Sequence, residues 1–255
     1  MRKEILRQAK ERLLRMHYES GVGHIGGNLS CLDLVMCLHH EALSAHDAFV
    51  LSKGHAAGAL YIALWSLGRL SEADLGTFHR EGTKLPGHPP ATGIPGIHFA
   101  TGSLGHGLSL SAGMALGKRL RGEPGQVYCL LSDGEWNSGS TWEALIFIAH
   151  HRLDNLVLIV DLNGLQGFGT TREVADLGSL AEKLRGFGLA VAEIDGHDPE
   201  AIRAAFSSRT PGPRAIVART RKGCGVSFME NKVEWHYLPM TEAQYRQALA
   251  EVRDA

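Results

Sequence analysis

The chain has 255 residues, of which 44% are hydrophobic and 21% charged, and its formal net charge is −1. This balance is typical of a soluble globular protein, and it gives no global field for nucleic acid or an acidic membrane. The N-terminus has no signal-peptide core, and no segment approaches the roughly 20 apolar residues of a membrane span. Three of the four cysteines lie in apolar contexts and none forms a CxxC pair, so we expect reduced thiols and a cytoplasmic location.

Helices and strands are predicted to alternate along the chain. The apolar spacing predicts a helix over 3–20, and a second helix near 30–42 follows a glycine-rich turn. A short strand then leads into a turn that carries His55, and another helix follows. The later elements are a helix over 107–121, a strand over 126–132, a helix over 139–152, a strand over 156–161, a helix over 178–187, a strand over 189–195, a helix over 198–207, a strand over 214–220 and a capped helix from 241.

This alternation of short β-branched strands with helices predicts an α/β fold. We expect one domain over residues 1–255, with three layers, a mostly parallel central sheet and helices on both faces. Residues 81–107 form a Gly/Pro-rich segment that is too long for a simple connection. Loops of this length are usually functional or disordered.

Asp133 and Asn163 each follow a predicted strand, and one helix connects the two strands. In a right-handed βαβ unit both strands end at the same edge of the sheet, where open α/β sheets bind ligands. Carboxylate and amide oxygens suit Mg²⁺ or Ca²⁺, and Gly134 would let a phosphate approach the backbone at a helix N-terminus. The spacing leaves a structural alternative open, in which Asp133 only caps the helix and Asn163-Gly164 only forms a turn.

Seven blocks of sequence occur in an order typical of one enzyme family. The block "SDGEWNSGSTWEA...LDNLVLIVDLNGLQ" resembles the thiamine diphosphate motif, in which an Asn follows an acidic GDG motif by about thirty residues. The other blocks are "GVGHIGG", "LSKGHAAGALY", "LPGHP", "TGSLGHGLS", "IDGHD" and "KGCGVSFMENKVEWH". Together they resemble the diphosphate-binding domain of transketolases over nearly the whole chain. The resemblance implies a thiamine-diphosphate-binding fold, with thiamine diphosphate and Mg²⁺ as cofactors and Ca²⁺ or Mn²⁺ as alternative ions.

The resemblance also implies roles for individual residues. It makes Asp133, Asn163 and the carbonyl of Leu165 the metal ligands. Four histidines would line the channel to the reactive carbon as catalytic groups that hydrogen-bond sugar hydroxyls and move protons, although each one alone could have a packing role: His24, His55, His88 and His236. The residues implied to contact the cofactor are His55, Gly102, Leu104, Gly134, Asn163, Lys222 and His236.

Some positions depart from the family pattern. Ser132 stands where Gly is usual, which should be tolerated if its φ is negative. Ser138 replaces a glutamate that belongs to an acidic link between paired active sites. The resemblance therefore leaves that link open.

A second domain is required in thiamine-dependent enzymes, because it holds the aminopyrimidine and supplies a glutamate. The chain ends at Ala255, and we expect that domain on a partner chain. The predicted function is the N-terminal subunit of a split transketolase, which moves a two-carbon ketol unit from a ketose to an aldehyde. We expect it to be active only with a C-terminal transketolase subunit, in an α₂β₂ assembly, on small sugars or sugar phosphates. The alternatives are a subunit of another thiamine-diphosphate carboligase, such as an acyloin synthase or specialised-pathway ketol transferase, a decarboxylating subunit, or a non-catalytic binding subunit.

Overall fold

A computed structural model describes residues 3–91 and 93–254 of the chain, so both ends of the predicted 1–255 domain lie outside the described residues. The described strands form one sheet in the order β1-β2-β3-β5-β4, and every pairing is parallel. The strands are β1 (Ala48–Leu51), β2 (Val127–Ser132), β3 (Leu156–Leu162), β4 (Ala190–Asp195) and β5 (Arg214–Arg219). This arrangement confirms the predicted α/β fold with a parallel central sheet.

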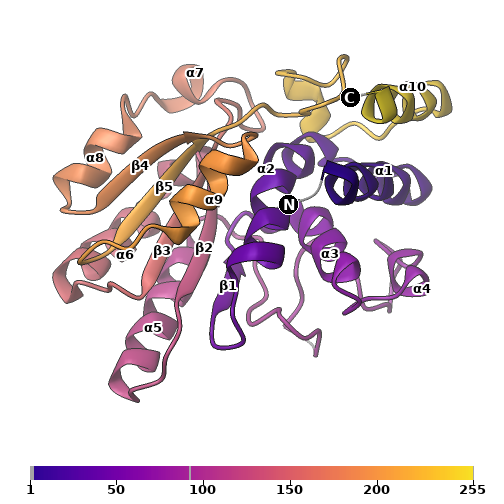
Figure 1. Cartoon of the computed structure of the whole chain (residues 1–255). Coiled ribbons are helices and arrows are strands. Elements are labelled where there is room, and N and C mark those ends of the chain that lie inside the picture. Colours follow the sequence, from indigo (N-terminus) through magenta and orange to yellow (C-terminus); the bar gives the residue numbers. More distant parts are fainter. Residues whose placement is uncertain (1–2, 92, 255) are drawn as a thin grey trace.

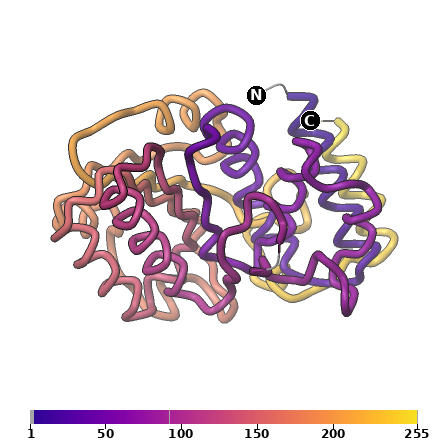
Figure 2. The backbone as a smooth tube through the Cα atoms, turned by 90° about the horizontal axis from the view of Figure 1, so that it is seen from below, coloured from indigo at the N-terminus to yellow at the C-terminus, as the bar shows by residue number. Residues whose placement is uncertain are grey.

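Helices cover both faces of this sheet (Figure 1). One face packs against α2 (Ile25–Cys37) and α9 (Pro199–Ser207), and the other against α5 (His106–Leu120), α6 (Gly139–His151) and α8 (Leu180–Gly186). Beyond α2 lie α1 (Lys3–Ser20), α3 (Ala57–Ser66) and α10 (Glu242–Asp254), and Figure 2 shows α1 and α10 side by side. The short helical pieces are α4 (Glu72–Leu75), α7 (Thr171–Ala175), a π turn at Leu38–Ala42, and 3₁₀ turns at Gly54–Ala56, Gly134–Asn137 and Val233–His236.

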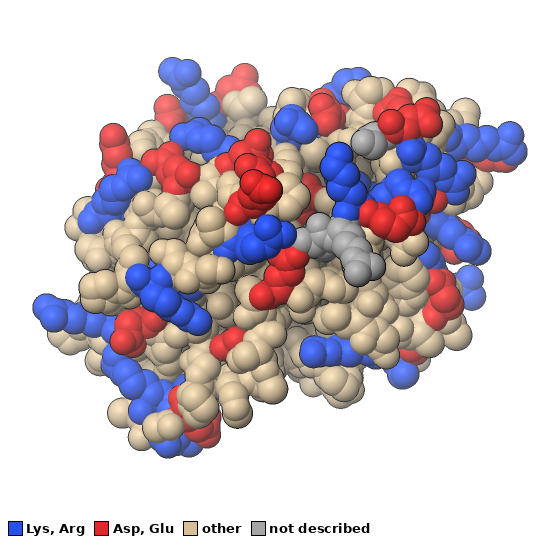
Figure 3. Space-filling model, in the orientation of Figure 1, with Lys and Arg blue, Asp and Glu red and all other residues tan. Residues whose placement is uncertain are grey.

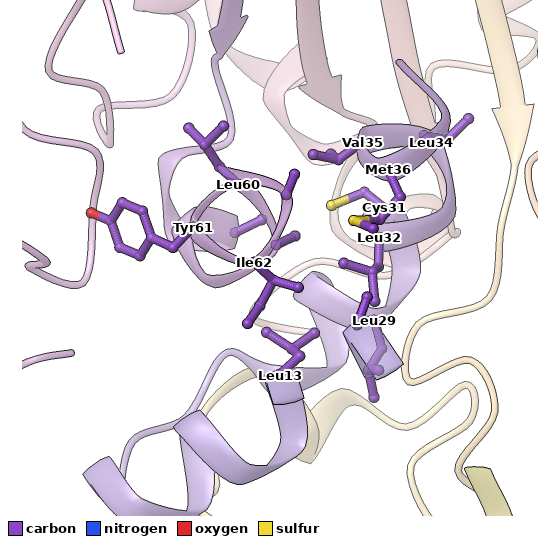
Figure 4. Packing of buried hydrophobic residues seen from close by; sticks show 14 of the residues in the cluster. Leu13, Leu29, Cys31, Leu32, Leu34, Val35, Met36, Leu60, Tyr61 and Ile62 are labelled. Atoms are coloured by element: carbon purple, nitrogen blue, oxygen red, sulfur yellow. The ribbon is translucent and has the colours of Figure 1, made fainter. Parts of the chain in front are cut away.

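Two apolar clusters separate the layers. Val157 and Ile159 of β3 face the cluster shared with α1, α2, α3 and α9, whereas Leu158 faces the cluster shared with α5, α6 and α8. Figure 4 shows the first cluster, in which Leu13 of α1 and Ile62 of α3 approach each other beside α2. A central strand that is buried on both faces requires a nearly continuous apolar sequence, and "LVLIV" supplies it.

The second helix begins earlier than the sequence predicts. It starts at Ile25 rather than near residue 30, so two glycines of "GVGHIGG" belong to its first turn. A Cβ on Gly26 would lie 3.1 Å from the carbonyl oxygen of Trp235 and 3.2 Å from Cγ of Lys222. Gly26 therefore allows a close contact between α2 and a loop, whereas the sequence predicted a turn at this position. The short helices α4 and α7 were not predicted either.

Other features agree with the sequence. Ser132 lies in extended β2, so the usual glycine is not needed there. The expected capping box begins α10, where the N–H of Gln244 donates to Thr241 Oγ1 and the N–H of Thr241 donates to Gln244 Oε1.

Positive and negative side chains are interspersed over the face seen in Figure 3. Within the described part of the chain, no helix is both long and apolar enough to cross a membrane.

The buried central strand gives a stability prediction. Leu158→Ala should lower the free energy of unfolding by about 2–5 kcal/mol, because it leaves a cavity between β3 and its neighbours. The matched control is Leu120→Ala, whose side chain at the end of α5 is 77% exposed and which should change that free energy by less than about 0.5 kcal/mol. Urea unfolding of both variants measures the difference. Equal effects would contradict the assignment of Leu158 to the core.

Candidate functional site

A cavity of about 280 Å³ lies at the carboxyl edge of the parallel sheet. Its walls come from the segments that follow β1, β2, β3 and β5, together with the start of α2 and the long loop before α5. Every residue that the sequence assigned to the site lines it: His24, His55, His88, Gly102, Leu104, Asp133, Gly134, Asn163, Leu165, Lys222 and His236. The fold thus brings the whole predicted set together, while the role of each residue stays a prediction.

Backbone N–H groups next to Asp133 and Asn163 hold the two side chains at the edge of the sheet. The N–H of Gly164 donates to Asp133 Oδ2 at 2.5 Å, and the N–H of Gly134 donates to Asp133 Oδ1 at 2.8 Å. The N–H of Leu165 donates to Asn163 Oδ1 at 3.0 Å. The cap and the turn of the structural alternative are therefore both present. They coexist with the convergence of the two strand ends, so the two interpretations are compatible.

The charge on Asp133 is poorly compensated. Burial, followed by the nearby carboxylate of Asp161, raises the pKa of Asp133 to about 7, although the N–H groups of Gly164 and Gly134 oppose the shift. A carboxyl group in such a place is stabilised in its ionised form by a neighbouring cation. Its oxygens and those of Asn163 and the Leu165 backbone are the hard donors that Mg²⁺ prefers. The donor set therefore fits a divalent cation.

Lys222 presents the opposite imbalance. Its side chain is buried, and among the described residues no carboxylate lies within ion-pair distance of it. Its ammonium group donates to Nδ1 of His236 at 2.9 Å. Burial, followed by the charge of Lys53, lowers the pKa of Lys222 to about 8. An anion such as a phosphate would stabilise this ammonium group.

The predicted channel histidines form a compact group. The ring centroids of His24, His55 and His236 lie 5.0–5.4 Å apart pairwise. The ring of His88 lies against Gly102, where a Cβ would come within 2.8 Å of it. Burial lowers the pKa of each ring, to about 3 for His236 and well below the usual value for His55. These rings are therefore neutral at pH 7, and each can offer one donor and one acceptor.

A buried ion pair beneath the cavity was missed from the sequence. The ammonium group of Lys53 bonds to Asp161 Oδ2 and donates to the carbonyl of Gly27 at 3.1 Å. Asp161 also accepts hydrogen bonds from Ser30 Oγ at 2.7 Å and from Thr220 Oγ1. The available signal was an acidic residue inside an otherwise apolar strand, since Asp161 belongs to β3 and pairs with Ser132.

A second buried carboxylate was missed as well. Glu135 is fully buried and accepts hydrogen bonds from Ser52 Oγ, from the N–H of Gly105 at 2.8 Å and from the N–H of Ser132 at 3.3 Å. It thereby joins three segments of the cavity wall. The sequence also gave no indication of Phe168, an 88% exposed side chain that lines the cavity.

Removal of one partner of the buried ion pair should destabilise the fold. Asp161→Asn leaves the Lys53 ammonium group buried without its carboxylate, and we expect a loss of about 3–5 kcal/mol in the free energy of unfolding. Glu242→Gln is the control, because it removes the carboxylate of an exposed pair with Arg246 and should cost less than about 1 kcal/mol. Denaturant unfolding at pH 7 gives both values. A comparable small loss in both variants would contradict a structural role of the pair.

Comparisons with known proteins agree with this geometry. A family model described as "Transketolase, thiamine diphosphate binding domain" matches residues 12–252. One of the subunits of the apulose-4-phosphate transketolase of Phocaeicola vulgatus is 38% identical, over 96% of this chain and 91% of the relative. The 6-deoxy-6-sulfo-D-fructose transketolase subunit SqwG of a Clostridium species is 39% identical, over 91% of this chain and 89% of the relative.

Solved structures show the same fold. The transketolase from Campylobacter jejuni matches with a TM-score of 0.91 and 27% identity, over 99% of this chain. The match covers 43% of the longer chain, so this protein spans less than half of that transketolase. The transketolase from Leishmania mexicana gives the same TM-score at 25% identity. The predicted fold and the family resemblance are thereby confirmed.

Proposed function

Because the chain belongs to the transketolase family, we propose that it is the diphosphate-binding subunit of a split transketolase, with residues 1–255 as one domain. The reaction is transfer of a two-carbon ketol unit from a ketose donor to an aldehyde acceptor. The proposal is supported by two buried charges that line the same cavity: among the described residues, no cation lies within ion-pair distance of the Asp133 carboxylate, and no anion lies within that distance of the Lys222 ammonium group. A divalent metal diphosphate supplies both missing charges.

The metal and the diphosphate are assigned to separate parts of the cavity. The carboxylate of Asp133, the side-chain oxygen of Asn163 and the carbonyl of Leu165 hold Mg²⁺, for which Ca²⁺ or Mn²⁺ can substitute. Lys222 neutralises diphosphate charge. The remaining residues assigned to contact thiamine diphosphate are His55, Gly102, Leu104, Gly134 and His236.

When bound, thiamine diphosphate supplies a nucleophilic carbon and an electron sink for breaking and forming the C–C bond. The chain's own contribution is hydrogen bonding and proton transfer at the sugar hydroxyls. Because the four channel histidines are neutral, each can accept a hydrogen bond from a sugar hydroxyl and donate one. The pKa values of His24 and His88 are lowered less than that of His236, so an imidazole nitrogen of these two can accept the proton of a donor hydroxyl and return it to the acceptor oxygen.

The proposed partner is a C-terminal transketolase subunit that carries the pyrimidine-type domain, in an α₂β₂ assembly. The names of two relatives of similar length support this, because each is named as one subunit of a transketolase. Exposed apolar side chains of α6, Ile146 and Phe147, offer a contact surface.

Relatives named for apulose-4-phosphate and 6-deoxy-6-sulfo-D-fructose support a sugar with an anionic group as substrate. Four buried, unpaired cysteines fit a reducing compartment such as the cytoplasm.

A ketol-transfer assay tests the proposed function. The partner subunit, the purified chain and their mixture are incubated with Mg²⁺, thiamine diphosphate and a panel of ketose donors and aldehyde acceptors. Only the mixture should form the ketose lengthened by two carbons. Turnover by the chain alone would contradict the split enzyme, and acyloin products or release of CO₂ from 2-oxo acids would replace the transketolase assignment by another thiamine-dependent reaction.

Loss of the Asp133 carboxylate should abolish Mg²⁺-dependent cofactor binding. Asp133→Ala in the assembled enzyme is compared with Asp154→Ala, which removes an exposed carboxylate at the opposite end of β3. Calorimetric titration with thiamine diphosphate, with and without Mg²⁺, measures the affinity. An Asp133→Ala enzyme with wild-type affinity and wild-type dependence on Mg²⁺ would remove Asp133 from the metal site.

The channel histidines should affect turnover more than folding. His88→Ala should lower kcat at saturating cofactor by about 10²–10⁴-fold, the usual contribution of a general acid–base group. His46→Ala, which removes an exposed ring from the turn before β1, should leave kcat unchanged. If the His88 variant keeps wild-type kcat, His88 has the packing role that the sequence left open.

A further inference from the structure

Three side chains meet outside the cavity, beneath the loop that carries Lys222. Asp33 comes from α2, His197 from the turn after β4, and Cys224 from the loop after β5. One ligand-type atom of each lies within 4.8 Å of the others, and all three side chains are buried or nearly so. None of them lines the cavity.

The ring of His197 is held at both ends. Its Nδ1 lies 2.6 Å from Asp33 Oδ2, and its Nε2 accepts the N–H of Arg221 at 2.9 Å. A backbone N–H can only donate, so this contact requires an Nε2 without a proton and places the ring proton on Nδ1, where it is donated to Asp33. Burial disfavours the charged ring, but the Asp33 contact raises the pKa of His197 to about 9, and the Arg221 N–H opposes protonation of Nε2. The carboxylate thus fixes the orientation of the ring, and the ring fixes the peptide group of Arg221.

This cluster is poorly suited to a metal ion. Both ring nitrogens of His197 are already engaged by the protein. The ammonium group of Lys10 lies 3.5 Å from Asp33 Oδ1, and the guanidinium group of Arg221 donates to Cys224 Sγ at 3.5 Å. Two positive groups beside the cluster would repel a cation. The geometry is that of a hydrogen-bonded support for the backbone.

The supported peptide directly precedes Lys222. On the other side of Lys222, the N–H of Gly223 donates to the carbonyl of Gly26 at 2.9 Å. The backbone of Lys222 is therefore fixed at both neighbours, and its buried side chain reaches the cavity beside His236. A lysine with several rotatable bonds loses less entropy on binding an anion when its backbone is already held.

We propose that Asp33 and His197 are positioning residues, which hold the Arg221 peptide so that Lys222 is placed to bind the cofactor's diphosphate. This inference rests on the proposed function, because it takes Lys222 as an anion ligand. Neither Asp33 nor His197 contacts the cofactor. Their effect should appear in cofactor affinity and should pass entirely through Lys222.

Two substitutions of His197 separate this role from general packing. In His197→Gln the side-chain oxygen reaches the place of Nε2 and can accept the Arg221 N–H. In His197→Asn the amide lies near the place of Nδ1, so the bond to Asp33 is kept and the Arg221 contact is lost. The experiment measures thiamine diphosphate affinity with Mg²⁺ in the assembled enzyme, and the thermal midpoint of each variant chain.

We expect His197→Asn to weaken cofactor affinity about 5–10-fold, the equivalent of one lost hydrogen bond, and His197→Gln to stay within about twofold of wild type. Equal losses in the two variants would overturn the positioning role, because loss of packing alone does not distinguish them. If His197→Asn does not fold, the Gln variant decides alone, and a loss of more than about fivefold contradicts the inference.

A double-mutant cycle with Lys222→Met completes the test. Lys222→Met alone should weaken the affinity, and adding His197→Asn to it should have no further effect. Full additivity would refute the action of His197 through Lys222 and leave the proposed function intact. Unchanged affinity in Lys222→Met would instead contradict the assigned role of Lys222 in the proposed function.

Discussion

The site depends on the buried carboxylate of Asp161. It bonds to Lys53 from the segment after β1, to Ser30 of α2 and to Thr220 from the segment after β5. The side-chain amide of Asn163 also donates to it at 3.3 Å. An isolated charge in such a place would be very costly, and the Lys53 ammonium group with these hydrogen bonds offsets the cost. The same contacts therefore satisfy one buried charge and fix four walls of the cavity.

The parallel sheet determines where the cavity lies. All strands end at one edge, so the polar residues that follow them face a common space. There the pKa of Asp133 is raised, mainly by burial, and the pKa of Lys222 is lowered, also mainly by burial. Both residues are thus less readily ionised than usual. The proposed metal diphosphate would favour the ionised form of both, because it would bring a cation to Asp133 and an anion to Lys222.

The sheet and the place of the cavity could be predicted from the local sequence. Short apolar strands between helices indicated the sheet, and the positions of Asp133 and Asn163 after two of them indicated its binding edge. Other features depend on tertiary contacts. The ion pair of Asp161 was not predicted, because its partner Lys53 is 108 residues away in the sequence. The start of α2 was misplaced because Gly26 meets a loop more than 190 residues later, and a glycine alone does not distinguish a turn from a close contact.

The lowered pKa values of the channel histidines could not be predicted from the sequence either. A histidine in a glycine-rich turn is expected to titrate near neutrality, but His55 and His236 are partly buried at the cavity wall, and the charges of Lys53 and Lys222 add to the lowering of their pKa values. Burial is a property of the packed chain, which no short motif encodes.

The most direct measurement is anomalous X-ray diffraction from crystals of the enzyme, assembled with its partner subunit, thiamine diphosphate and Mn²⁺. An anomalous peak in contact with the Asp133 carboxylate, the Asn163 side-chain oxygen and the Leu165 carbonyl, with the diphosphate on its open side next to Lys222, is the predicted result. An ion bound elsewhere, or a diphosphate bound without contact to Asp133 and Lys222, would contradict it.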